Sequence, residues 1–315
     1  MTDRGEKQVN DLELYLKAGE AVSKALERGF ELVKPNASVL EICEEVEDVI
    51  RKLSDGPAFP CNLSVSYEAA HYSPIPDDNK KLPEKGIVKL DLGAHVQGRI
   101  ADAAISIVLD ESVKKHVKLS NAVKMALHRA IEKVKPNVPV ALIGSTINYT
   151  LKKEGFKPIR NLGGHSLGLY LVHSGVSIPN VPERLPFRLE KGGAYAIEPF
   201  GTDGAGYVVE GEEVTIFSLN PRPPKHSLLK VSDEEKHLMV EIENRFKTLP
   251  FSPRWLLDVY PYDRLIEILA SLTKKGILID YPVLLEAKRG EVAQWEHTIL
   301  ITDKEAIVTT KTSLH

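Results

Sequence analysis

Two aspartates in a short apolar hairpin are the first residues of this chain whose types and spacing suggest chemistry. The run Val88 to Val108, VKLDLGAHVQGRIADAAISIV, predicts two strands joined by HVQG, where the glycine supplies turn geometry. With the turn centred between Val96 and Gln97, antiparallel pairing places Asp91 directly opposite Asp102. Opposed like charges destabilise a sheet unless a cation or a shared proton neutralises them. The alternative is that this face of the hairpin is wet and both carboxylates are solvated.

Three further candidates stand in apolar or glycine-rich contexts. His165 follows two glycines in GGHSLG, which let the backbone approach something closely, and a neutral imidazole is a common metal ligand. Glu198 in AYAIEPF and Glu296 in AQWEHTILI lie in apolar strands, where a glutamate is rare unless it is ion-paired or binds a metal.

Four embedded carboxylates and one histidine form a ligand set that suits two divalent ions such as Mn, Fe, Co or Zn. Their four negative charges balance two such ions. Two ions held about 3.5–4 Å apart would lower the pKa of a shared water to ~7 and so supply a nucleophile at neutral pH. The set predicts a hydrolase.

The elements that must position these residues occur in two copies. Apolar periodicity predicts helices over about 7–33, 38–53, 114–134 and 140–153, and the residues of about 59–70 are typical of a strand. Residues 21–42 and 122–143 are identical at 12 of 22 positions, where chance gives about one. This internal duplication predicts an α+β domain with halves related by a pseudo-twofold axis, helices on the outer face of a curved sheet, and a site between the halves.

The character of the chain changes at Asn220, where PRPP breaks the strand pattern. Ser232 with Glu235 forms a predicted capping box, and Pro261 opens a helical run that Gly276 closes. We expect a helical insertion subdomain over 220–285, set into a catalytic domain made of residues 1–219 and 286–315.

Composition limits the classes of partner. The 315 residues are 43% hydrophobic, and 41 Lys+Arg against 44 Asp+Glu give a net charge of −3, which offers no overall case for nucleic acid or an acidic membrane surface. No apolar run has the length of a membrane span, and the charged N-terminus does not have the pattern of a signal peptide. Cys43 and Cys61 are the only cysteines and form no CxxC motif. We therefore expect a cytoplasmic protein, and a monomer.

Five segments in order resemble the methionine aminopeptidases of the pita-bread fold, type 2: AAHYSP at 69–74, KLDLGAHVQGRIADAA at 89–104, GGHSLGLYLVHSG at 163–175, AIEPFGTDGAG at 196–206 and AQWEHTILI at 293–301. The resemblance runs over nearly the whole chain. The predicted helical insertion resembles the type 2 subdomain, which type 1 enzymes lack. The basic N-terminal extension of eukaryotic type 2 members is missing, which favours an archaeal-like protein and leaves its association with the ribosome open.

The resemblance implies roles for the candidate metal ligands. In that family the residue matching Asp91 binds one ion, those matching His165 and Glu198 bind the other, and those matching Asp102 and Glu296 bridge both. Glu198 would also carry a proton. The implied reaction is removal of the initiator methionine from nascent chains and peptides with a small second residue.

The resemblance also implies a substrate site. The residue matching His71 lies by the substrate and assists catalysis, and the one matching His173 contacts the substrate beyond its first residue. The methionine pocket would be lined by Phe59, Val172 and Tyr281, although the first and second of these serve equally well as structural core.

Two alternatives are open at this point. Xaa-Pro aminopeptidases and dipeptidases share the fold and ligands but usually carry a further N-terminal domain, and only 90 residues precede Asp91 here. Non-catalytic pita-bread proteins that bind the ribosome or RNA typically lose metal ligands and gain basic tails, and this chain shows neither change. Substrate assays and metal analysis would separate these classes.

Overall fold

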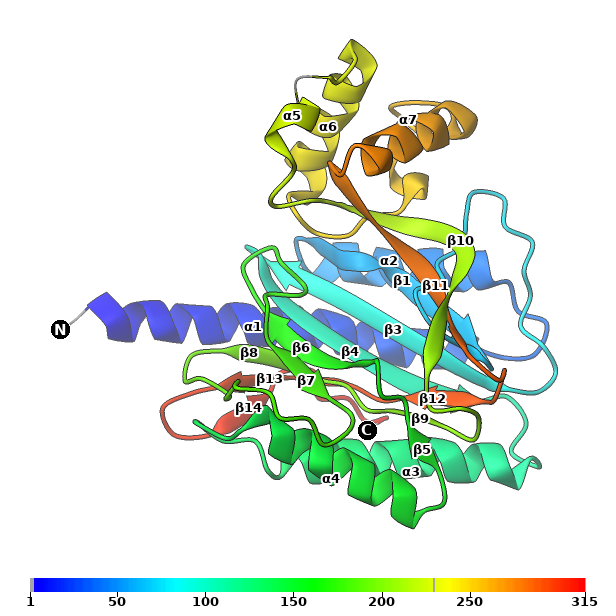
Figure 1. Ribbon diagram of the computed structural model, residues 1–315, viewed down its shortest axis with the longest axis vertical. Coiled ribbons are helices and arrows are strands. Elements are labelled where there is room, and N and C mark those ends of the chain that lie inside the picture. The colour runs from blue at the N-terminus through cyan, green and yellow to red at the C-terminus, as the bar shows by residue number, and fades with distance from the viewer. Residues whose placement is uncertain (1–2, 229, 315) are drawn as a thin grey trace.

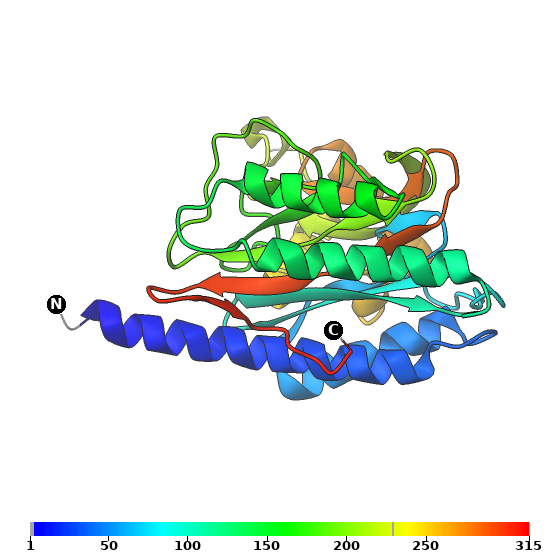
Figure 2. The same ribbon diagram turned by 90° about the horizontal axis from the view of Figure 1, so that it is seen from below.

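The computed structural model describes residues 3–228 and 230–314 and shows an α+β architecture. Strands form the middle of the molecule, two long helix pairs cover its outer sides, and a small helical group stands at one end (Figure 1). The view turned by 90° shows the strands between helix α1 and the pair α3 and α4 (Figure 2). In the residues that the structure describes, no helix is long and apolar enough to cross a bilayer.

The first half is a helix pair packed on an antiparallel sheet. Its elements are α1 (Asp3–Leu32), α2 (Val39–Leu53), β1 (Gly56–Val65), β2 (Glu68–Ala70), β3 (Ile87–Val96) and β4 (Arg99–Val108). The Ser38 hydroxyl caps α2 by accepting a hydrogen bond of 3.3 Å from the Glu41 amide. Strands β1, β3 and β4 lie side by side in that order.

The predicted β3–β4 hairpin is confirmed, but its predicted register is wrong. Asp91 pairs with Ala104, and Asp102 pairs with Gly93. The turn is centred one residue later than expected, on Gln97 and Gly98, whose φ values of 49° and 77° suit a two-residue type I′ turn. A shift of two in the pairing sum keeps both carboxylates on one face, so the aspartates are diagonal neighbours rather than directly opposed.

The second half repeats the helix pair and the turn inside it. Its elements are α3 (Lys114–Ile131), α4 (Val140–Lys153), β5 (Lys157–Pro158), β6 (Gly163–Leu167), β7 (Ser177–Pro179), β8 (Ala194–Ile197) and β9 (Phe200–Thr202). Asn36 and Asn137, which are equivalent in the duplication, have φ values of 64° and 68°. Their backbone amides donate to equivalent loop carbonyls, Leu82 O at 2.9 Å and Leu189 O at 2.7 Å. The duplication therefore extends to the backbone conformation of the turn.

The remaining chain builds the helical group and returns to the sheets. Its elements are β10 (Val208–Leu219), α5 (Lys225–Leu228), α6 (Asp233–Phe246), the 3₁₀ helix η1 (Pro253–Leu256), α7 (Tyr262–Lys274), β11 (Leu278–Glu286), β12 (Val292–Gln294), β13 (His297–Ile301) and β14 (Ala306–Val308). The capping box predicted at Ser232 and Glu235 is present. The helical group has its own apolar cluster, which includes Leu238, Leu256 and Leu269. Strands β10 and β11 pair with each other and connect this group to the body (Figure 1).

Candidate metal centre

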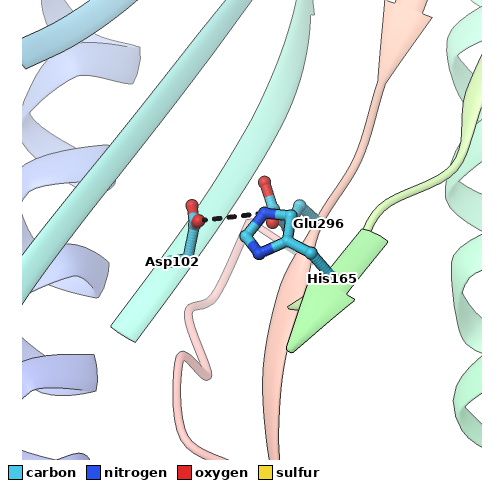
Figure 3. Close-up of side chains that lie close together, drawn as sticks. All are labelled: Asp102, His165 and Glu296. Carbon is cyan, nitrogen blue, oxygen red and sulfur yellow. Dashed lines mark ion pairs between the residues drawn. The ribbon is translucent and has the colours of Figure 1, made fainter. Parts of the chain in front are cut away.

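All five predicted ligands converge, although they come from separate elements. Asp91 lies on β3, Asp102 on β4 and His165 on β6, while Glu198 follows β8 and Glu296 lies between β12 and β13. Ligand atoms of Asp102, His165 and Glu296 lie within 4.8 Å of one another, and so do those of Asp91, Glu198 and Glu296. Figure 3 shows the first group, in which His165 Nε2 is 3.7 Å from Asp102 Oδ2. Glu296 belongs to both groups, and Glu198 is grouped with Asp91 rather than with His165.

Glu296 is positioned by a seam between β4 and the segment β12–β13, which run antiparallel. At two positions on this seam a side-chain hydroxyl accepts a hydrogen bond from the backbone amide of the facing residue and donates one to its carbonyl oxygen. One backbone hydrogen bond lies between these two positions. The contacts are Thr298 Oγ1 with Asp102 N and O at 2.8 and 2.9 Å, Glu296 N with Ala104 O at 3.0 Å, and Ser106 Oγ with Gln294 N and O at 2.9 and 2.8 Å. The seam fixes Glu296 beside the aspartate-bearing hairpin.

His165 is positioned by the two glycines before it. A Cβ on Gly164 would lie 2.1 Å from the Ala196 carbonyl oxygen, and one on Gly163 would lie 2.4 Å from the Ile178 carbonyl oxygen. The close approach predicted for these glycines is therefore to strands β8 and β7. Within the sheet His165 pairs with Ala196, two residues before Glu198.

Gln294 belongs to the site and was not predicted as part of it. Its side-chain amide donates to Asp91 Oδ2 at 3.0 Å and to Glu198 Oε1 at 2.7 Å, so one group holds two of the carboxylates. The side chain is 1% exposed. Its position two residues before Glu296 on an extended segment was a usable signal, because alternate residues point to the same side.

Without a bound cation these carboxyl groups do not stay ionised easily. Burial raises the pKa of Asp91 to about 7. Burial, followed by repulsion from the neighbouring carboxylates, raises the pKa of Asp102, Glu198 and Glu296 well above the ordinary range. Burial, and then the nearby His173, lowers the pKa of His165 well below its usual value, which leaves a neutral imidazole able to donate a lone pair.

Several polar atoms at this centre are buried without a hydrogen-bond partner in the part of the chain that the structure describes. They are Asp91 Oδ1, Asp102 Oδ1, His165 Nδ1 and both carboxylate oxygens of Glu296. Buried polar atoms are normally satisfied, so unpaired oxygens on several converging carboxylates call for a partner. Divalent cations fit this donor set because they accept oxygen and imidazole ligands and neutralise the buried charge.

The centre opens into a cavity of about 510 Å³, and all five predicted substrate residues line it: Phe59, His71, Val172, His173 and Tyr281. Phe59 and Val172 are buried, at 7% and 5% exposed, whereas Tyr281 is half-buried and its hydroxyl lies 3.0 Å from that of Ser218. The lining of the cavity therefore combines aromatic and apolar side chains with the carboxylates Asp91, Asp102 and Glu198.

His71 is held in an unusual backbone conformation with one tautomer defined. Its φ is 67°, in the left-handed region that non-glycine residues rarely adopt. Nδ1 lies 3.2 Å from the Pro282 carbonyl oxygen, which can only accept, so Nδ1 carries the proton and Nε2 has the lone pair. Burial lowers the pKa of His71 to about 4, so the ring is neutral near pH 7.

Comparisons with known proteins agree on one family. The model of metallopeptidase family M24 matches residues 13–303. A methionine aminopeptidase of Saccharolobus solfataricus is 45% identical over 304 residues, which cover 96% of this chain and 98% of the relative.

Solved structures with lower identity share the fold. A methionine aminopeptidase of Thermotoga maritima has a TM-score of 0.68 at 24% identity, with 96% of this chain and 97% of that chain covered. A thermophilic Arx1 has a TM-score of 0.81 at 18% identity, with 96% and 91% covered. The pita-bread fold expected from the sequence is confirmed.

Proposed function

The chain belongs to metallopeptidase family M24, and we propose that it removes the initiator methionine from nascent chains and peptides whose second residue is small. Methionine aminopeptidase activity is supported by relatives of that name at up to 45% identity over nearly the whole chain. The protein is a metal-dependent hydrolase that acts on peptide N-termini.

One observation of the site carries the proposal: buried, unpaired carboxylate oxygens converge beside an apolar cavity. Asp102, His165 and Glu296 form one close group, and Asp91, Glu198 and Glu296 form another. We propose that the five residues hold two ions, chosen from Co, Mn, Fe or Zn, with Glu296 shared between them. The charge count supports two ions, because four carboxylates balance two divalent cations.

The chemistry that divalent cations supply at such a site is polarisation of the scissile carbonyl and activation of water near neutral pH. The residues of the chain do the rest. Glu198 Oε1 is held by Gln294 at 2.7 Å, which leaves Oε2 as the atom that carries a proton to the leaving amine. His71 Nε2 accepts a hydrogen bond from the substrate, because its other nitrogen is committed to Pro282.

The cavity supports specificity for a free N-terminal methionine. The substrate's ammonium group would meet the carboxylates, and the methionine side chain would contact Phe59, Val172 and Tyr281. His173 would contact the chain beyond the first residue; its ring centroid lies 4.2 Å from that of His165. An endopeptidase substrate has no free amine to place there.

The proposal includes an organisation of the chain and a place of action. We propose that residues 1–219 with 286–315 form the catalytic domain and 220–285 a subdomain. The apolar cluster that joins α6, η1 and α7 to the adjoining ends of β10 and β11, at Phe217 and Leu278, supports this division. We propose a cytoplasmic monomer that acts on emerging chains near the ribosome.

The test is hydrolysis of Met-Ala-Ser, Met-Leu-Ser and an Xaa-Pro peptide by protein that was dialysed against a chelator and then reloaded with single metals. We expect no cleavage by the dialysed protein and metal-dependent cleavage of Met-Ala-Ser well above Met-Leu-Ser. Cleavage of the Xaa-Pro peptide alone would overturn the substrate proposal. Protein that holds no divalent ion after loading would overturn the metal centre.

A further inference from the structure

The two copies of the duplicated helix pair carry opposite charge. Residues 13–52, which cover most of α1 and α2, contain six Lys+Arg and nine Asp+Glu, a net charge of −3. The equivalent residues 114–153, which cover α3 and α4, contain nine Lys+Arg and one Glu, a net charge of +8. The overall charge of −3 conceals this difference.

The difference arises mainly from lost acids. Basic residues occupy five equivalent pairs of positions: 17 and 118, 28 and 129, 34 and 135, 51 and 152, 52 and 153. On α2, Glu44, Glu45, Glu47 and Asp48 correspond to Ser145, Thr146, Asn148 and Tyr149 on α4. The second copy has therefore kept five of the six cations of the first copy but only one of its nine acids.

The two copies differ in their ion pairs as a result. In the first copy Arg28 bonds Glu45 at 3.1 Å and Glu31 at 3.2 Å, and Arg51 bonds Asp48 at 2.9 Å. In the second copy, Lys115 pairs with Asp203 and Lys124 donates to the Leu314 carbonyl oxygen. Within the described ranges the other basic side chains of that copy have no carboxylate partner: Lys114, Lys118, Arg129, Lys133, Lys135, Lys152 and Lys153.

The lost acids leave an open groove where the first copy has its ion pairs. The groove lies between α3 and α4 and has a volume of about 430 Å³. It is lined by Arg129, Glu132, Lys133, Ser145, Thr146, Tyr149 and Thr150, so one acid lies among the basic and neutral residues. Tyr149 is 63% exposed, so a large aromatic face stands among unpaired cations. The two helices lie side by side along one outer edge of the molecule (Figure 1).

We propose that the α3–α4 face, defined as the groove residues together with Lys135, Lys152 and Lys153, binds the phosphate backbone of RNA. Unpaired lysines and arginines along a helix pair match a polyanion, and binding releases its condensed counterions. Tyr149 supplies a ring on which an unpaired base stacks. The choice of RNA rests on the proposed function, because an enzyme that acts on emerging chains works beside ribosomal RNA.

The duplication itself supplies the test. Ser145→Glu, Thr146→Glu and Tyr149→Asp together give α4 the acids of the first copy. The matched control, Glu44→Ser with Glu45→Thr and Asp48→Tyr, gives α2 the residues of the second copy. Binding of a fluorescein-labelled RNA hairpin to the metal-loaded protein is followed by anisotropy over a series of KCl concentrations, and Met-Ala-Ser hydrolysis is measured for each protein.

We expect the unaltered protein to bind RNA with a Kd that rises steeply with salt. The α4 variant should bind at least about 10-fold more weakly, with the slope of log Kd against log[KCl] reduced by about 2 to 3, while the control keeps its affinity or gains some. Tripeptide hydrolysis should be unchanged in both. An α4 variant that binds RNA as tightly as the unaltered protein would overturn the inference, as would displacement of RNA by equimolar poly-glutamate, which would indicate an acidic protein partner. An unaltered, metal-loaded protein that binds RNA but does not hydrolyse Met-Ala-Ser would instead contradict the proposed function and leave RNA binding standing.

Discussion

The two halves of the molecule share a helical scaffold but position their ligands in different ways. In the first half, Asp91 and Asp102 lie on ten-residue strands whose ladder fixes both side chains. In the second half, His165 and Glu198 lie on or beside strands of five and four residues, and glycine contacts position them. Regular backbone pairing between β3 and β4 positions Asp91 and Asp102. The ligands of the second half depend instead on close glycine contacts at a few positions. Duplication has therefore preserved the outer scaffold while the inner surfaces specialised.

We expect Glu296→Gln to have the largest effect, because Glu296 belongs to both ligand groups, and each group takes one further ligand from each half. We expect hydrolysis to fall more than about 1,000-fold, since the metal contribution to such reactions is several kcal/mol. Metal content after dialysis should fall below that of the unaltered protein, as measured by elemental analysis. The chelated variant should unfold at a higher temperature than the chelated parent, because one of four mutually repelling carboxylates is gone. Glu190→Gln, at an exposed position, is the control and should change neither quantity.

His71→Asn separates proton chemistry from metal binding. Asparagine tolerates the positive φ at this position better than alanine does, so the backbone should be retained. We expect turnover of Met-Ala-Ser to fall about 100-fold or more, which is the range typical of the loss of an acid–base group. The metal content should be unchanged. Loss of metal in this variant would show that the role assigned to His71 is wrong.

Gln294→Leu tests whether the halves are tied together by the amide that bonds Asp91 and Glu198. Removing a group that orients metal ligands typically costs 10–100-fold in metal affinity. We expect metal affinity, measured by chelator competition, to fall by about that factor, with a smaller change in turnover at saturating metal. Unchanged affinity would mean that the β-ladder alone positions Asp91.

The pH dependence of the metal-free protein tests the electrostatics of the centre. Burial raises the pKa of Asp91 from 3.8 to about 7 in the folded state, so the folded protein holds this proton more tightly than the unfolded chain. The resulting loss of folded-state stability is absent below pH ~4. It grows as the pH rises toward 7, because Asp91 ionises at a lower pH in the unfolded chain than in the folded protein. We expect the chelated protein to melt at least about 3 °C lower at pH 7.5 than at pH 5. Added metal should raise the melting temperature more at pH 7.5 than at pH 5, and equal melting temperatures for the chelated protein at both values would contradict the raised pKa.

Local rules predicted much of this fold from the sequence. Helical periodicity predicted the two long helix pairs, and the capping box predicted at Ser232 is present. The identity between residues 21–42 and 122–143 predicted the duplication to which the turns at Asn36 and Asn137 belong. The register of the hairpin was missed because HVQG allows two centres, and only the backbone at Gln97 and Gly98 decides between them. Because the turn centre was predicted one residue too early, the predicted partner of Asp91 was Asp102, two residues before its actual partner, Ala104.

The site was predictable as a set of residue types but not as a geometry. Carboxylates in apolar strands indicated metal binding, yet spacing along the chain does not say that Glu296 lies in both ligand groups. That fact depends on the seam between β4 and β13, which joins residues almost 200 positions apart through hydroxyls. Gln294 was missed because an amide carries no charge to attract notice, although its two bonds to carboxylates are specific.

The smallest predicted effect concerns the equivalent asparagines of the duplicated turn. Asn36 and Asn137 have φ values of 64° and 68°, a conformation that costs alanine about 1–2 kcal/mol. We expect Asn36→Ala and Asn137→Ala each to destabilise the protein by about 1 kcal/mol and the double variant by the sum, because the two turns are separate sites. Urea unfolding of the metal-loaded protein measures this, and Asn→Gly at each position is the control that should cost less. Equal losses of unfolding free energy would show that each copy depends on its own equivalent asparagine. A loss at one turn alone would show that the helical scaffolds, like the ligands, have diverged.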